Sequence, residues 1–297
     1  MAEFRHFEEK DYDAVISFLI ELSRDSMDHI HWNWARFEWM FEHPEFDKAS
    51  IDSIGLWAGG NRIVGAAIYD QYFGEAFCGA LSGYEDLYPE ILDYAYENLK
   101  DDAGLGIAIC DDSQYEIKTA EEHGFVIAEQ AETILEKKLD GDMPVLLPKG
   151  ISITEPDPIE DAEALQWLFW QGFDHGDDRA EFEKQLQIVT KVRPHLNPHL
   201  GLAAVNESGE MVSFCCLWYT PETDYAYVEP VCTVPSWRKR GIAKALLFES
   251  MSRARELGAK RAYVISEQEF YKKLGFEKMK HFTFYWKNDC IKKLLIL

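Results

Sequence analysis

The chain carries a basic loop that ends in glycine, and this loop is the segment with the most definite chemistry. Residues 237–243 read WRKRGIA, so three cationic side chains precede Gly241. We expect a strand before this loop and a helix after it, and the first amides of a helix have no backbone acceptor. The partial positive charge of the helix dipole lies at the same end. Because glycine lets a ligand approach the backbone closely, these features together predict a phosphate-binding site.

The same loop differs from two other phosphate-binding sequences. It contains neither GxxxxGK[ST] nor GxGxxG, which disfavours a nucleoside triphosphatase and a dinucleotide-binding fold. A solvated basic loop at a helix start is the alternative interpretation of this short motif when it is taken alone.

A strand and a helix must position the loop. The pattern predicts a strand over residues 225–234, which Pro235 ends. Apolar residues then recur at helical spacing from residue 242 to residue 257, and Gly258 suits a helix C-terminus. A further strand is predicted over residues 261–265.

The two halves of the chain repeat one order of elements. Each half is predicted to hold a strand, a helix, a hairpin, a helix, a strand and a short segment that ends in Gly-Phe. The matching segments are 3–7 and 151–155 for the first strand, 12–22 and 159–173 for the helix, 55–70 and 201–219 for the hairpin, and 106–125 and 261–276 for the last part. We therefore predict an α/β fold with two copies of one unit, each a mixed, mostly antiparallel sheet flanked by helices.

The charge distribution and the turn residues indicate where the domains meet. Residues 1–148 hold 10 Lys and Arg against 32 Asp and Glu (−22), whereas residues 149–297 hold 20 against 21 (−1), and the sum is the net charge of −23. Glycine and proline cluster between these parts. The predicted organisation is a first domain over 1–143, a linker over 144–150, a second domain over 151–290 and an apolar tail over 291–297, which we expect to dock on the fold or on a partner.

The composition excludes several classes of protein. A net charge of −23 disfavours a nucleic-acid partner, and no apolar stretch is long enough for a membrane span or a signal peptide. The six cysteines form no CxxC pair, so we expect reduced thiols in a cytoplasmic protein and no metal site. The acidity either supports solubility or attracts a cationic substrate.

The aromatic stripe over residues 31–40 is expected in the core or, alternatively, in the wall of a substrate cleft. A homo-oligomer is one possible state of the protein.

Residues 225–277 resemble the conserved motifs of the GNAT acetyltransferase superfamily. The resemblance lies in VxxVPxxRxxGxA, in the following helix and strand, and in FYxxLGF at residues 270–276. It implies a tandem GNAT protein whose second domain binds acetyl-CoA through the loop amides. The implied cofactor-binding residues are Arg238, Lys239, Arg240, Gly241, Ile242, Ala243 and Lys244 at the diphosphate, and Cys232, Thr233 and Val234 beside the pantetheine and acetyl groups.

The resemblance also suggests the catalytic groups. Acetyl transfer needs a neutral amine, a donor to the thioester oxygen and a proton for the departing thiolate. The Val234 amide is the implied donor to the oxygen, and Tyr271 is the implied acid. Glu229 is the candidate base, although a lowered amine pKa would make a base unnecessary.

The first copy lacks the loop motif. Residues 79–100 contain no RxxGxA, and Glu85 and Asp86 stand at the helix start, where they would repel a diphosphate. We therefore expect a degenerate first domain that forms one wall of the acceptor cleft. The predicted function is transfer of an acetyl group from acetyl-CoA to a primary amine, of a cationic small molecule or a peptide. The alternatives are a non-catalytic CoA-binding sensor or scaffold and a transferase with another acyl donor.

Overall fold

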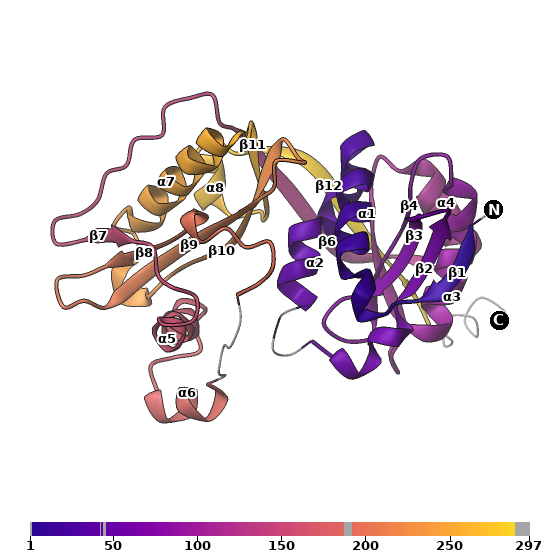
Figure 1. Cartoon of the computed structure of the whole chain (residues 1–297), viewed down its shortest axis with the longest axis horizontal. Helices are drawn as coiled ribbons and strands as arrows, with labels where there is room; N and C mark the ends of the chain where they lie inside the picture. Colours follow the sequence, from indigo (N-terminus) through magenta and orange to yellow (C-terminus); the bar gives the residue numbers. More distant parts are fainter. Residues whose placement is uncertain (1, 42, 44–45, 187–191, 289–297) are drawn as a thin grey trace. The chain divides into compact units, whose positions relative to one another are not determined.

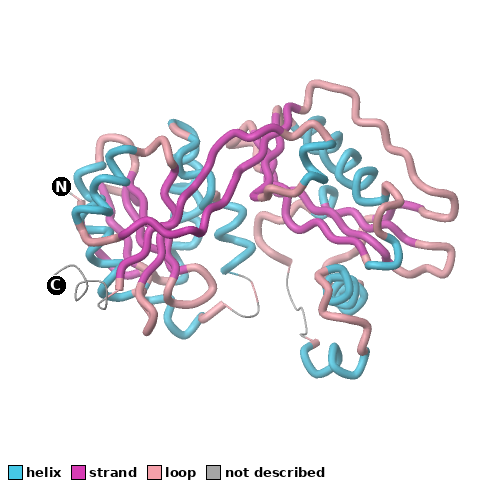
Figure 2. Tube along the Cα trace, turned by 180° about the vertical axis from the view of Figure 1, so that it is seen from behind, coloured by secondary structure: helices cyan, strands magenta, loops and turns pink. Residues whose placement is uncertain are grey.

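The chain forms two compact units in the computed structural model, which describes residues 2–288 except 42, 44–45 and 187–191. The first unit comprises the chain up to Ile134, together with Ile265–Glu267 and the chain from Lys278 onward. The second unit comprises Leu135–Val264 and Gln268–Glu277. Each unit is a sheet covered by helices (Figures 1 and 2). No helix in the described part of the chain has the length and apolarity to cross a membrane.

The first unit follows the predicted order of elements. Its strands are β1 (Glu3–His6), β2 (Gly55–Gly59), β3 (Arg62–Tyr69), β4 (Glu75–Ala80), β5 (Leu105–Cys110) and most of β6 (Val126–Lys138). Its helices are α1 (Tyr12–Asp25), α2 (Trp34–Phe41), α3 (Tyr88–Asn98) and α4 (Gln114–Glu122). The pairs β1–β2, β2–β3 and β3–β4 are antiparallel, and β4–β5 is parallel. Helices α1 and α2 lie on one side of this sheet, and α3 and α4 lie on the other (Figure 1).

The second unit repeats that order. Its strands are β7 (Ser152–Thr154), β8 (Gly201–Val205), β9 (Met211–Tyr219), β10 (Tyr225–Thr233) and β11 (Arg261–Ile265). Its helices are α5 (Ala162–Gly172), α6 (Arg179–Gln185), α7 (Ile242–Leu257) and α8 (Glu269–Lys273). Strands β7 to β10 pair antiparallel in sequence order, and β10–β11 is parallel. The predicted mixed α/β architecture with a repeated unit is confirmed.

The last strand, β12 (Glu277–Lys287), lies in the sheet of the first unit. It occupies the position between β5 and β6 and pairs antiparallel with β5 from Phe282↔Cys110 to Lys287↔Leu105. In the second unit, the position next to β11 is filled by the end of β6. Strand β12 thus completes the sheet of the first unit, and only the end of β6 belongs to the second unit.

This arrangement differs from the predicted domain limits of 1–143 and 151–290. The first compact unit ends at Ile134, and Lys278 onward returns to it, because β12 completes the first sheet. The predicted linker over 144–150 contains no helix or strand. The predicted tail over 291–297 lies outside the described residues.

The core of the second unit has one layer on each face of its sheet. Along β9, Cys215 and Leu217 pack with α7, whereas Phe214 and Cys216 pack with α5. Such alternation is the period-2 pattern of a strand that is buried on both faces. Helices α7 and α5 therefore hold β10 from opposite faces, and the strand ends at the basic loop (Figure 1).

Candidate functional site

The loop after β10 turns sharply and exposes its backbone. Lys239 has a φ of +61° and Gly241 a φ of +84°, so two positions lie in the left-handed region. A Cβ atom at Gly241 would have no neighbour within 4 Å, so the space over this residue is open. Glycine is needed there for its backbone conformation and not for lack of room.

The amides that follow Gly241 are free of the helical ladder. The first hydrogen bond of the α7 helix runs from the Ala245 amide to the Gly241 carbonyl, at 3.1 Å. The amides from Gly241 to Lys244 precede that bond and have no helical acceptor. They lie at the positive end of α7, and a left-handed residue followed by a helical one makes a concave anion-binding turn. The loop can therefore hold a phosphate or diphosphate.

Three of the basic side chains border this turn. The Arg240 guanidinium stacks 4.6 Å from the Trp237 ring centroid and donates to the Ser236 carbonyl at 2.9 Å. The Lys244 ammonium lies 5.2 Å from the Phe248 ring, and Lys239 is exposed. These groups add positive charge around the free amides.

Arg238 bonds to the main chain of two neighbouring elements. Its Nε donates to the Thr233 carbonyl at 2.9 Å, and its Nη2 donates to the Gly172 carbonyl at 2.9 Å. Nη2 also lies 2.9 Å from Oδ1 of Asp174, a residue with a φ of +65°. The guanidinium thus ties the end of α5 to the end of β10.

Close packing accompanies this tie. A Cβ atom at Gly172 would lie 2.8 Å from Cβ and Sγ of Cys232, so only glycine fits at this helix end. Cys232 is 5% exposed, and burial raises the pKa of its thiol to about 12. Its thiol is therefore protonated at neutral pH and is a packing group, not a nucleophile.

Strands β10 and β11 separate beyond their first residues. Their parallel register runs from Tyr225↔Arg261 to Tyr227↔Tyr263, whereas β10 continues to Thr233. On its other side, β10 stays paired with β9 as far as Thr233↔Ser213, with an irregularity after Val228. The separation leaves an edge of β10 that an extended ligand can pair with.

The Val234 amide is already used inside the protein. It donates to the Val212 carbonyl at 3.0 Å, so it is not available to a thioester oxygen in this structure. Successive amides of a strand point to opposite sides. The Thr233 amide therefore points away from β9, the side on which the Thr233 carbonyl accepts from Arg238.

Tyr271 lies in an apolar environment, and the charge of Glu229 influences the pKa of its phenol. Tyr271 is 7% exposed, and its ring packs 5.0 Å from Phe270 and 5.5 Å from Phe276. Burial raises the pKa of its phenol well above the ordinary value, and the negative charge of Glu229 raises it further. The main chain of Glu229 is held by the Trp218 indole, which donates to its carbonyl at 2.9 Å.

The first unit has a different turn at the corresponding place. Gly83 also has a φ of +84° and open space, but its amide donates to the two carboxylate oxygens of Glu85 at 3.0 and 2.9 Å. The turn before the final Gly-Phe is alike in both units, because Phe276 bonds to Tyr271 and Phe125 bonds to Ala120. In the first unit, the Glu85 carboxylate therefore occupies the glycine amide of the turn, and Ala120 stands at the position of Tyr271.

One group of possible metal ligands occurs among the described residues. Asp28, Cys110 and Asp112 place their ligand atoms within 4.8 Å of one another. The Lys280 ammonium lies 2.7 Å from both carboxylates and supplies their counter-charge. This arrangement suits an ion-pair network and not a cation site.

The second unit, which carries this loop, matches a family of known enzymes. Residues 162–276 match the model of the Acetyltransferase (GNAT) family, and the match contains the loop, Glu229 and Tyr271. The match covers residues 162–276, less than half of the chain. No curated protein sequence matches the chain significantly.

Solved structures share the fold over nearly the whole chain. The GCN5-related N-acetyltransferase from Sphaerobacter thermophilus is 17% identical with a TM-score of 0.61, over 96% of this chain and 95% of that one. A tandem GNAT protein from the clavulanic acid biosynthesis pathway is 14% identical with a TM-score of 0.61, over 96% and 98%. N-myristoyltransferase from Saccharomyces cerevisiae is 13% identical with a TM-score of 0.55, over 96% and 78%. The predicted tandem GNAT fold is confirmed.

Proposed function

We propose that this protein is an acyl-CoA-dependent N-acyltransferase that transfers an acetyl group from acetyl-CoA to a primary amine. The observation that carries the proposal is the turn at Gly241, whose amides up to Lys244 have no helical acceptor at the positive end of α7. A diphosphate supplies the acceptor oxygens that these amides lack. The GNAT domain match over residues 162–276 agrees with this ligand.

The rest of the donor would follow β10. Beyond Tyr227 the edge of β10 that faces β11 is open, so the amide groups of a pantetheine arm can bond to it as an added strand does. Residues Cys232 and Thr233 then lie near the thioester. We assign the polarising donor to the Thr233 amide, because the Val234 amide is bonded to Val212.

The reaction needs one bond to form and one to break. The neutral amine nitrogen attacks the thioester carbonyl carbon, the carbon–sulfur bond breaks, and an amide forms. The nitrogen loses a proton and the CoA sulfur gains one, so the transfer involves no oxidation or reduction. Tyr271 remains protonated at neutral pH because burial raises its pKa, and it would donate to the departing sulfur.

Glu229 would accept the proton of the amine, directly or through water. Its charge acts on Tyr271, so the carboxylate and the phenol belong to one cluster. The acidic composition of the first 148 residues favours a cationic acceptor.

Mass spectrometry of amines incubated with acetyl-CoA tests the proposal. Calorimetric titration with CoA, measured first, separates binding from turnover. If CoA binds and a broad panel of cationic amines gives no acetylated product, the protein is a CoA-binding sensor instead. A longer acyl-CoA that reacts where acetyl-CoA fails would instead reassign the donor.

A further inference from the structure

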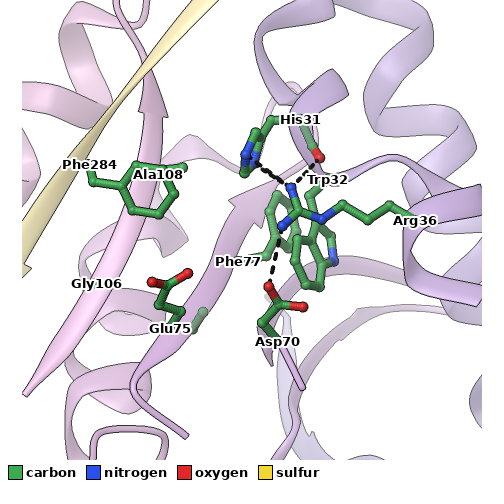
Figure 3. Close-up of a pocket in the computed structure, with 10 residues that line it drawn as sticks. His31, Trp32, Arg36, Asp70, Glu75, Phe77, Gly106, Ala108 and Phe284 are labelled. Atoms are coloured by element: carbon green, nitrogen blue, oxygen red, sulfur yellow. Dashed lines mark hydrogen bonds and ion pairs between the residues drawn. The ribbon is translucent and has the colours of Figure 1, made fainter. Parts of the chain in front are cut away.

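The first unit holds a small pocket that none of the proposed chemistry uses. It is lined by residues of strands β4, β5 and β12 and of the 3-10 helix Met27–Trp32, with Arg36 from α2 and Asp70 from the turn after β3. The lining residues include His31, Trp32, Arg36, Asp70, Glu75 and Phe77 (Figure 3). Its volume of about 20 Å³ exceeds the roughly 10–15 Å³ that one water molecule needs. The pocket can take a water molecule or a group of similar size.

Negative charge exceeds positive charge around this pocket. The Arg36 guanidinium lies 3.3 Å from the Asp70 carboxylate and 3.8 Å from the Glu132 carboxylate. His31 contacts Glu132 and lies 3.0 Å from Arg36, and burial together with the Arg36 charge lowers the pKa of its imidazole. The neutral imidazole adds no positive charge at pH 7. With Glu75, three carboxylates therefore surround one permanent cation.

Glu75 is the carboxylate with the least compensation. It lies on the opposite side of the pocket from Arg36, which is turned toward His31 and Asp70 (Figure 3). Burial and the Asp70 charge raise the pKa of Glu75, whereas Arg36 and a hydrogen bond with Gln130 lower it only in part. A cation at this side of the pocket would relieve that repulsion.

The rest of the wall is apolar, and one polar group in it has no hydrogen-bond partner among the described residues. Trp32 stacks on Phe77 at 5.9 Å, and Phe284 and Ala108 complete the far wall. The indole N–H of Trp32, a residue that is 4% exposed, has no hydrogen-bond partner among the described side chains and backbone. Apolar walls exclude water from a bound charge and suit the methylene groups beside it.

We propose that this pocket binds the ammonium head of a small alkylamine, with Glu75 as its counter-ion. An –NH3⁺ group has the size that the pocket accepts, and its three N–H donors suit the surrounding carboxylates. The alkyl chain would extend from the opening past the aromatic wall. The site belongs to the first unit alone and does not depend on the acyltransferase proposal.

Calorimetric titration of the full chain at low salt tests this site. The probes are propylammonium chloride and 1-propanol, which differ mainly in charge. We expect one equivalent of propylammonium to bind and 1-propanol not to bind. Binding of 1-propanol with equal affinity, or no binding of propylammonium, would overturn the proposal and leave a water-filled pocket.

Matched variants separate this pocket from the general acidity of the protein. Glu75→Gln should lower the affinity for propylammonium at least tenfold. Glu97→Gln removes the same charge from an exposed position on α3 and should leave the affinity unchanged. Equal losses in both variants would show that only the net charge attracts the amine.

A second variant tests the volume without a change of charge. Ala108→Leu places extra methyl groups into the pocket and should abolish binding of propylammonium. Retained binding would place the ligand elsewhere. Titration of the same variants with CoA should match the wild type, so this proposal and the proposed function fail separately.

Discussion

Substitution of Gly241 by alanine perturbs the proposed diphosphate cradle with the smallest change in atoms. At a φ of +84° an L-residue is strained, by roughly 1–2 kcal/mol for the left-handed region. No atom lies within 4 Å of the added Cβ, so no steric clash adds to this cost. We therefore expect a loss of about 1 kcal/mol in the free energy of unfolding.

Gly83 in the first unit is a matched control for that strain. It has the same φ of +84° and the same open space, so Gly83→Ala should lose a similar free energy of unfolding. The two variants should differ in CoA affinity, because the Gly83 amide is occupied by Glu85. Gly241→Ala should weaken CoA binding at least tenfold, which is about 1.4 kcal/mol, and Gly83→Ala should leave it unchanged.

Calorimetric titration with CoA and thermal unfolding measure the two effects on the same samples. Unchanged CoA affinity in Gly241→Ala would refute the assignment of the cradle. An equal loss of affinity in Gly83→Ala would mean that the effect comes from general destabilisation.

Three further predictions concern other parts of the molecule. Tyr271→Phe should lower the turnover of acetyl-CoA by ~10²–10⁴-fold with unchanged CoA affinity, and unchanged turnover would show that Tyr271 has no catalytic role. Because burial raises the pKa of Tyr271, its ionisation should not reduce wild-type turnover between about pH 7 and 10. Arg238→Met should speed alkylation of Cys232, measured by mass spectrometry, because the Gly172 end of α5 is no longer bonded to β10. Lys239→Met removes an equal charge from an exposed residue and should leave the alkylation rate unchanged. Truncation after Glu277 removes the buried Phe282, Phe284 and Tyr285 and should expose the first unit to proteolysis, because three such side chains contribute ~5–9 kcal/mol; equal protease resistance would contradict the assignment of β12.

Local patterns in the sequence were sufficient for the elements around the site. The helical spacing after Gly241 predicted α7, and the residues around it predicted β10 and β11 at nearly their observed limits. A helix start exposes its amides whatever the rest of the fold does, so the cradle is a local property of the chain.

The partners of β12 and Arg238 could not be read in the same way. β12 has the alternating pattern of a strand, which suits either sheet, and its pairing with β5 joins segments far apart in the chain. Arg238 is cationic and next to the loop, which suggested a phosphate ligand. Its guanidinium also bonds to the Gly172 carbonyl, an acceptor that no local motif marks.

The most direct test of the account is a crystal structure of the protein with CoA. The account predicts diphosphate oxygens within hydrogen-bond distance of the amides from Gly241 to Lys244, with the pantetheine arm along the open edge of β10. A diphosphate bound elsewhere, such as at the turn of Gly83 and Glu85, or a cradle without CoA at saturating concentration, would contradict it.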